Sequence, residues 1–409
     1  MELAPIFKKA YWFLAFAGLV YVLGVFSLTY TYIQRAALYM HKLNPTYIQD
    51  VNDAEYFGFL KSQVQPFNIR TPDNENLYAW HILPPYLCKK YEELLLANAS
   101  SGPAEDVTKT MTFKLLTEDP NARVVVNLHG NAAHIASGYR PQVYRSFLGA
   151  STPDHPVHVI AFDYRGFGLS TGSPTEDGLI TDALAVINYL TSPPLSIHPS
   201  RIAIAGQSLG TAVAAGVAER YTFGNPSSVP DPLAGYVLFG AFADLRTLIA
   251  SYSPMGIFPP LLSALLPYPK FHNYILSHMV DSWDSASRFG RLTGANPQPG
   301  DANSARANQD FNLAIVHAAN DFEIPWRNGM LLYESVVGGH NANVLGNNVQ
   351  NYVSSDGVVQ VKVWEKELEA KTVVRKVKRV RWERVRYGGH NQVAATAGAT
   401  VAIMRIFDK

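Results

Sequence analysis

The chain has 409 residues, of which 47% are hydrophobic and 16% are charged. This length suits two or three average domains or one enlarged α/β domain with insertions, and the apolar fraction excludes disorder along most of the chain. The 34 basic and 33 acidic residues nearly cancel, so no overall positive field would attract a nucleic acid, and we expect no such partner. The single cysteine, Cys88, excludes an intrachain disulfide and a cysteine-rich metal site.

Residues 10–33 form a run of 24 residues without a charge. As a helix rising about 1.5 Å per residue, the run would reach roughly 36 Å, enough to cross a hydrocarbon core of about 30 Å. Aromatic residues stand at both ends, as membrane interfaces favour, and no convincing cleavage site follows. We interpret the run as an uncleaved single-pass anchor; the alternatives are a removed signal peptide and a buried core helix. Lys8 and Lys9 precede it, Arg35 and Lys42 follow it, and with the N-terminal amine this balance favours a cytoplasmic N-terminus by a small margin.

Behind this run the chain alternates between strand-like and helix-like segments. The first short β-like runs, separated by a polar insert near 98–106, are 67–70, 77–83 and 123–128. Four apolar runs then have the pattern of strands buried on both faces: 157–162, 202–205, 236–239 and 313–316. Helix-like stretches accompany them at 175–190, 209–221 and 326–337. With a last basic, β-branched run at 373–385, this order predicts a mostly parallel, doubly wound sheet of eight strands with right-handed crossovers.

Two segments interrupt the alternation. The first, from residue 246 to about 310, begins apolar among prolines and turns small and polar from Thr293, which predicts an inserted cap and a mobile loop. Its apolar residues are Ile257, Phe258, Leu261, Leu262, Leu265 and Leu266. The second, 340–355, is rich in Asn and Gly and is interpreted as a surface loop. The expected division is 1–36 for the tail and anchor, 37–115 for a lead-in, 116–245 for the first half of the core, 246–311 for the cap and 312–409 for the second half of the core.

The pattern Gly-x-Ser-x-Gly occurs twice, and its context distinguishes the two copies. The copy around Ser208 directly follows a strand-like run and opens a helix, the context of a nucleophile elbow. Such a turn strains the serine backbone, presents Oγ above the sheet edge and aims the positive end of the helix at developing negative charge. The copy around Ser170 has neither neighbour, so we interpret it as a glycine-rich loop. The alternative for Ser208 is an N-cap in an inert turn.

Partners for such a nucleophile can be placed from the same pattern. Two backbone amides must hold an oxyanion, and we expect them from Leu209, which follows the serine, and from Asn131 in the loop after 123–128. His129 in that loop is interpreted as structural. A carboxylate should follow in the chain order Ser, Asp, His, and Asp321 comes just after a buried strand; Glu323 is the weaker alternative.

The histidine has a competitor, because Gly-Gly-His-Asn occurs twice. His390 follows the strand-like run 373–385 and precedes a closing helix at 392–407, whereas His340 ends a helix with no further strand behind it. We therefore assign the base to His390 and interpret His340 as an exposed loop residue. The basic residues between 371 and 386 belong either to the charged face of a strand or to a surface for anionic lipid or phosphate.

These motifs resemble those of the membrane-anchored α/β-hydrolases of the lysophosphatidylserine and monoacylglycerol lipase type and of the fungal Bem46-like proteins. The resemblance covers residues 10–409 and rests on the N-terminal run, the histidine before the last helix and four segments: 128–131, 162–170, 206–211 and 317–325. It implies an α/β-hydrolase fold with a cap and a transmembrane helix. The chain departs from that family at Gln207, where the elbow more often carries His, and in a segment between residues 341 and 386 that looks longer than usual.

The expected activity is hydrolysis of carboxylic esters of acyl lipids, monoacylglycerol or lysophospholipid, through an acyl-enzyme formed on Ser208. No cofactor or metal is expected, the expected partners are the lipid substrate and the bilayer, and no obligate protein partner is evident. We expect a single-pass protein of the endoplasmic reticulum with a lumenal catalytic part. The alternatives are a thioesterase or peptidase with the same residues, or a membrane-tethered interaction protein without catalysis.

Overall fold

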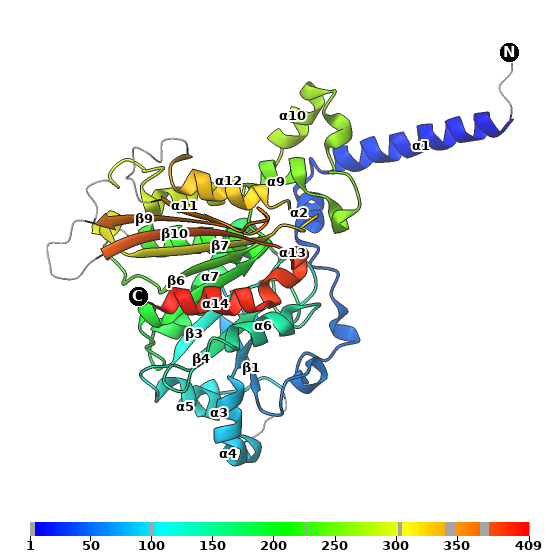
Figure 1. The fold of residues 1–409 in the computed structure, drawn as a ribbon. Coiled ribbons are helices and arrows are strands. Elements are labelled where there is room, and N and C mark those ends of the chain that lie inside the picture. Colours follow the sequence, from blue (N-terminus) through cyan, green and yellow to red (C-terminus); the bar gives the residue numbers. More distant parts are fainter. Residues whose placement is uncertain are drawn as a thin grey trace.

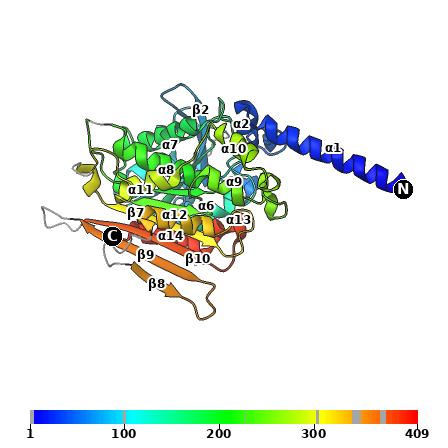
Figure 2. The ribbon, with the colours of Figure 1, turned by 90° about the horizontal axis from the view of Figure 1, so that it is seen from above.

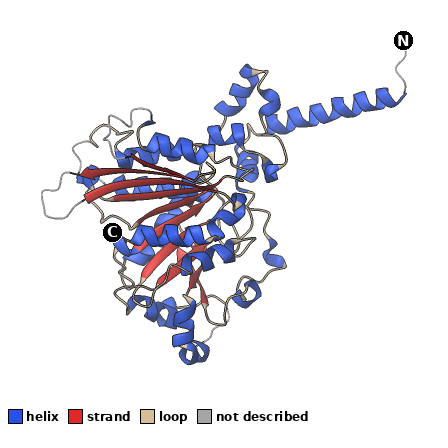
Figure 3. Cartoon of the chain, viewed as in Figure 1, coloured by secondary structure: helices blue, strands red, loops and turns tan. Residues whose placement is uncertain are grey.

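The computed structural model describes residues 5–98, 102–225, 227–301, 305–339, 349–368 and 376–408. Within these ranges ten strands form one mixed sheet in the order β1-β2-β4-β3-β5-β6-β7-β10-β9-β8, flanked by helices (Figure 3). The strands are β1 (Val64–Arg70), β2 (Asn76–Ile82), β3 (Arg123–Leu128), β4 (Val157–Phe162), β5 (Ile202–Gln207), β6 (Gly235–Phe239), β7 (Phe311–Ala318), β8 (Val349–Val353), β9 (Gln360–Leu368) and β10 (Lys376–Val385).

Helices cover both faces of this sheet (Figure 1). The α-helices of the described ranges are α1 (Pro5–Ser27), α2 (Thr31–Tyr39), α3 (Pro85–Lys90), α4 (Glu92–Ala97), α5 (Met111–Thr117), α6 (Arg140–Leu148), α7 (Glu176–Thr191), α8 (Leu209–Phe223), α9 (Leu245–Ser251), α10 (Pro269–Ser277), α11 (Ser285–Thr293), α12 (Arg327–Val336), α13 (Gly389–Gln392) and α14 (Ala397–Phe407). Buried residues of α7, α8, α11 and α12 pack on one face, and those of α6 and α14 pack on the other.

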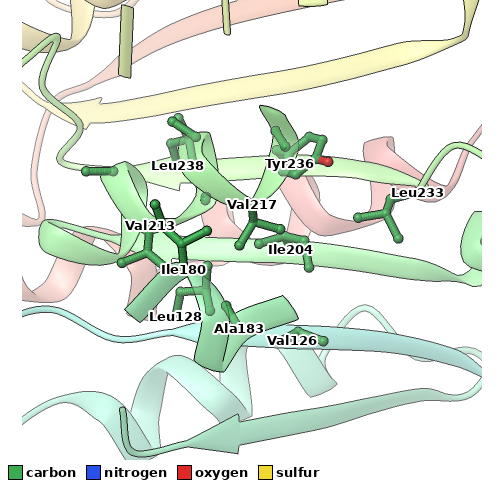
Figure 4. Packing of buried hydrophobic residues seen from close by; sticks show 14 of the residues in the cluster. Val126, Leu128, Ile180, Ala183, Ile204, Val213, Val217, Leu233, Tyr236 and Leu238 are labelled. Atoms are coloured by element: carbon green, nitrogen blue, oxygen red, sulfur yellow. The ribbon is translucent and has the colours of Figure 1, made fainter. Parts of the chain in front are cut away.

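The two cores arise from the period of two along each strand, which sends successive side chains to opposite faces. In β3, Val124 and Val126 pack in the core with α7 and α8, whereas Val125 packs in the core with α6 and α14. Figure 4 shows strand residues of the first core meeting helix residues from α7 and α8; among those labelled are Val126, Leu128, Ile180, Ile204, Val213, Val217 and Leu238.

The centre of the sheet is parallel, and this arrangement fixes where a site can form. Strands β4, β3, β5, β6, β7 and β10 pair in parallel, with antiparallel strands added at both ends. Carboxyl ends of parallel strands lie along one edge of a sheet. The segments that follow β3, β5, β7 and β10 therefore meet at that edge, although they are far apart in the sequence.

All eight predicted strands are present, but the predicted strand count is wrong because β8 and β9 extend the sheet beyond β10 (Figure 2). Strand β8 lies inside 340–355, which was predicted to be a surface loop; residues 340–348 of that segment are outside the described residues. The sequence of β8, Val-Gln-Asn-Tyr-Val, lacks the apolar alternation that predicts a strand, and all five residues are exposed. In β9 only Val363 and Trp364 are buried, which is also too little for a clear pattern.

The basic segment predicted as a strand is β10 from residue 376 onward, while residues 369–375 lie outside the described residues. Val380 and Trp382 on β10 are buried in the core. Cations on this strand have nearby anions, as Arg379 pairs with Glu365 at 2.5 Å and Arg381 with Glu383 at 2.9 Å. These contacts favour a charged strand face over a free lipid-binding surface.

The N-terminal apolar run is divided between two helices. By length and composition α1 could cross a membrane, but it ends at Ser27 rather than continuing to residue 33 as predicted. The chain turns at 28–30, and α2 then packs on the folded part of the chain, where Arg35 and Tyr39 bind Asp281 at 3.2 and 2.8 Å. The sequence does not reveal this turn, because Leu28, Thr29 and Tyr30 are uncharged and so continue the charge-free run.

The predicted cap contains α9, α10 and α11, and we propose 246–311 as its extent. Its six apolar residues fall into two groups: Leu262 and Leu265 are buried in a cluster with Val25 of α1, whereas the exposed ones are Ile257, Phe258, Leu261 and Leu266. Tyr21 of α1 also donates a hydrogen bond to the carbonyl of Leu261 at 2.8 Å. The cap therefore lies against the end of α1 (Figure 1).

Candidate active site

Ser208 occupies the sharp turn between β5 and α8. Its backbone is in a strained conformation with φ 53° and ψ −120°, and its N–H donates to the carbonyl of Phe239 at 2.9 Å. The two flanking glycines are required by close approach: a Cβ at Gly206 would lie 2.4 Å from the oxygen of Gly210, and one at Gly210 would lie 2.0 Å from the oxygen of Leu128. This is the local geometry expected of a nucleophile elbow.

The loop after β3 passes directly beside Ser208. A Cβ on Gly130 would lie 3.4 Å from Cβ and 4.0 Å from Oγ of Ser208. The next residue, Asn131, makes no backbone N–H hydrogen bond to any acceptor in the described part of the chain. Leu209 is the first residue of α8, so its N–H has no partner within the helix. Both amides that the sequence analysis singled out are thus available near Ser208.

Asp321 lies in the turn that follows β7, where the chain holds its carboxylate from two sides. Oδ1 accepts backbone N–H bonds from Glu323 at 3.0 Å and Ile324 at 2.9 Å, and Oδ2 accepts from Nδ1 of His390 at 2.9 Å. Glu323, the alternative carboxylate, instead accepts from the side chain of Asn391 at 3.2 Å. The geometry therefore pairs His390 with Asp321.

A second histidine, His317, contacts the same carboxylate and was not assigned a role from the sequence. Its Nε2 lies 3.3 Å from Oδ2 of Asp321 and 2.8 Å from the carbonyl of Ile324. Burial disfavours the charge of Asp321, but the hydrogen bonds from His317 and His390 outweigh burial and hold its pKa well below the usual carboxyl range. Asp321 is consequently ionised at any physiological pH.

The environment of His390 acts in two directions on its pKa. Burial lowers the pKa, whereas the hydrogen bond to Asp321 and the charges of Asp321 and Glu323 raise it, so the net pKa lies above that of an ordinary histidine. Because an ionised carboxylate can only accept, Nδ1 of His390 carries the proton that it donates to Asp321. The neutral ring therefore has Nε2 free to accept a proton.

Gln207 ties the serine turn to the histidine segment. Its side-chain Nε2 donates to the carbonyl of His390 at 3.0 Å, and the ring of His390 packs so closely on Gly240 that a Cβ there would lie 3.2 Å from it. The position at which the sequence departs from the resembled family is thus used to seat the histidine. Sequence spacing alone gave no signal for this contact.

The competing serine has an evident structural role, and the competing histidine is not described. Oγ of Ser170 accepts the N–H of Tyr78 at 2.9 Å and donates to the carbonyl of Asp163 at 2.7 Å, which fits the predicted glycine-rich loop. His340 lies outside the described residues. His129 is buried, with Nδ1 2.6 Å from the carbonyl of Gly130, as a structural histidine would be. Within the described ranges, no group of three or more His, Cys, Asp or Glu side chains could hold a metal ion.

Comparison with known proteins gives a family match for the chain and several relatives. The model of the family described as "Alpha/beta hydrolase family" matches residues 124–390. The chain is 25% identical over 311 residues to "Lysophosphatidylserine lipase ABHD12" of Danio rerio, covering 74% of this chain and 66% of that protein. It is 29% identical over 153 residues to "Protein bem46" of Schizosaccharomyces pombe, covering 37% of this chain and 46% of that protein. The chain therefore spans less than two thirds of either relative.

Among solved structures, the chain resembles an alpha-beta hydrolase from Vibrio vulnificus with a TM-score of 0.52 and 14% sequence identity. The match covers 91% of this chain and 92% of that one. This likeness and the family match together confirm the fold class that the sequence predicted, with ten strands in place of eight.

Proposed function

The chain belongs to the alpha/beta hydrolase family, and from that premise we propose that it is a membrane-anchored serine hydrolase cleaving carboxylic esters of acyl lipids. The observation that carries the proposal is the position of His390: it is hydrogen-bonded to the buried carboxylate of Asp321 at 2.9 Å and tied by Gln207 to the strained turn of Ser208. The similarity to relatives named as lysophosphatidylserine lipases supports a lipid ester as substrate.

In the proposed reaction, Oγ of Ser208 attacks the ester carbonyl while Nε2 of His390 takes its proton. Asp321 holds the imidazole in the required tautomer and stabilises the imidazolium that forms. The carbonyl oxygen becomes an oxyanion, which the N–H groups of Asn131 and Leu209 bind. His390 then protonates the leaving alcohol, and water, deprotonated by the same histidine, releases the fatty acid from the acyl-enzyme.

The surroundings of α1 support a lipid substrate taken from a bilayer. Tyr21, which binds the cap, stands six residues before the end of α1 at Ser27, or about 9 Å along a helix axis. With α1 proposed as the membrane anchor, its contacts put the cap beside the helix that would enter the bilayer, which favours entry of a single-chain lipid there.

A test of the activity is turnover of a substrate panel by the purified full-length protein in lipid nanodiscs. We expect hydrolysis of monoacylglycerols and lysophospholipids to exceed that of acyl thioesters and peptide amides. Faster thioester or amide cleavage would assign the protein to those alternative classes, and no turnover of any member by folded protein would favour the non-catalytic alternative.

We also propose that the protein lies in the endoplasmic reticulum membrane with its catalytic part in the lumen. Protease protection in sealed microsomes tests this topology. Digestion of the catalytic part without detergent would contradict it.

The raised pKa of His390 predicts how activity depends on pH. The base must be neutral to accept a proton, so kcat/KM should fall as the pH drops through the pKa of His390, with a midpoint above the ordinary pKa of a histidine. Replacing Asp321 with Asn removes the interaction that raises this pKa, so the residual activity of Asp321→Asn should have its midpoint at lower pH. An unchanged midpoint in Asp321→Asn would contradict the pairing.

The cap offers a test of lipid entry with a matched control. Ile257 and Phe258 are 80% and 55% exposed, so replacing both with serine should change the free energy of unfolding by only about 0.5 kcal/mol per site. We expect this double variant to cleave a short soluble ester at the parental rate and to lose most turnover of long-chain monoacylglycerol in nanodiscs.

The control replaces the buried residues Leu262 and Leu265 with serine, which should cost about 2–5 kcal/mol per site because they lie in the cluster with Val25. Melting temperature is measured beside both activities. A parallel loss on both esters in the variant of Ile257 and Phe258 would leave these residues without a role in lipid entry.

A further inference from the structure

Arg140, the first residue of α6, binds the loop after β3 that carries the backbone N–H of Asn131. Its Nη2 is 3.0 Å from the carbonyl oxygen of Gly130, 3.0 Å from that of Asn131 and 2.8 Å from that of Ala132. Its Nη1 donates to the carbonyl of His134. One guanidinium thus gathers four carbonyl oxygens of a single loop: three share the two N–H groups of Nη2, and the fourth is on Nη1.

These contacts fix the direction of the backbone N–H of Asn131, which is one of the two proposed oxyanion donors. In a trans peptide the carbonyl of one residue and the N–H of the next point in opposite directions. The carbonyl of Gly130 points toward Arg140 and also lies 2.6 Å from Nδ1 of His129. The N–H of Asn131 must therefore point away from Arg140, and it is free of backbone acceptors in the described ranges.

The loop needs such support because its backbone is strained. Ala132 and Ala133 have φ of 63° and 58°, in the left-handed region that non-glycine residues disfavour. On its other side, the loop is held by the last turn of α2, since the N–H of Ala132 donates to the carbonyl of Tyr39 at 2.9 Å. Arg140 and Tyr39 thus both bind the backbone of Ala132, one at its carbonyl and the other at its N–H. These two contacts fix the position of the loop beside Ser208.

We propose that Arg140 is a positioning residue of the oxyanion site: its guanidinium holds the carbonyls of residues 130–132 and 134 so that the N–H of Asn131 meets the negative oxygen beside Ser208. The proposal rests on the proposed function and names a residue that touches no substrate. Lysine cannot reproduce the whole set, because Nη2 contacts the carbonyls of residues 130–132 while Nη1 contacts that of His134, and one ammonium nitrogen cannot occupy both positions. Loss of Arg140 should therefore weaken binding of the transition state and spare binding of the ester.

The test compares Arg140→Lys with Arg145→Lys in full-length protein in nanodiscs. Arg145 lies on the same helix, donates to the carbonyl of Phe57 and packs 4.6 Å from the ring centre of Phe59, so it controls for loss of a structural arginine. We measure kcat and KM for a short soluble ester, and the affinity for an alkyl boronic acid, which adds to the serine as a tetrahedral anion. Values are normalised to the folded fraction.

For Arg140→Lys we expect kcat and boronate affinity to fall together by about 10²-fold, the effect of losing one oxyanion donor, with KM within about twofold of the parent. Added guanidinium ion should restore part of the rate of Arg140→Ala. If Arg140→Lys retains the kcat and boronate affinity of Arg145→Lys, Arg140 is structural and the inference is overturned. The same holds if its KM rises while kcat is unchanged. Absence of turnover in the parent would instead refute the proposed function.

Discussion

Alanine in place of Ser208 is expected to reduce ester hydrolysis by about 10⁴-fold or more, to the level of the remaining binding and oxyanion contacts. The reason is that Ser208 supplies the attacking oxygen, and alanine has no side-chain oxygen to replace it. The measurement is initial rate on monoacylglycerol and on a short soluble ester. The fold should survive, because the side chain of Ser208 makes no described hydrogen bond that alanine would break.

The matched control is Ser170→Ala, which carries the same change in the other Gly-x-Ser-x-Gly copy. It removes the side-chain bonds to Tyr78 and Asp163, so it should lower the free energy of unfolding by about 1–3 kcal/mol and retain most activity per folded molecule. If Ser170→Ala silenced a folded protein while Ser208→Ala stayed active, the assignment of the nucleophile would be reversed.

The second large effect is expected for His390→Ala, which should lower kcat by about 10³-fold or more because no other base takes the serine proton. Its rate is measured on the same two esters. His340→Ala, the same substitution in the second Gly-Gly-His-Asn copy, should change the rate little. Equal losses at His390 and His340 would undo the choice between them, and retained activity in His390→Ala would exclude it as the base.

Much of the fold was predictable because its strands are buried on both faces. Runs such as 157–162 and 313–316 are continuous and apolar, and the parallel order follows from the helices between them. Ser208 was singled out by what precedes and follows it in the chain. His390 was singled out against an identical tetrapeptide for the same reason, since only one copy follows a strand.

The remainder depends on tertiary contacts that leave no periodic trace in the sequence. Strand β8 is exposed along its length and resembles a loop in composition. The turn at 28–30 interrupts a run of uncharged residues, and the division of the cap into buried and exposed residues is set by α1 packing against it. His317 and Arg140 are further examples, because their roles arise from where a turn and a loop fold back on them.

Peptide mapping of a covalently labelled protein shows whether Ser208 is the nucleophile of an acyl-lipid hydrolase. Purified full-length protein in nanodiscs is treated with a fluorophosphonate, digested and analysed by mass spectrometry, with and without an excess of monoacylglycerol or lysophospholipid. We expect one adduct, on the peptide that carries Ser208, and protection of that serine by the acyl lipids. An adduct on another serine, or no adduct on folded protein, would contradict it.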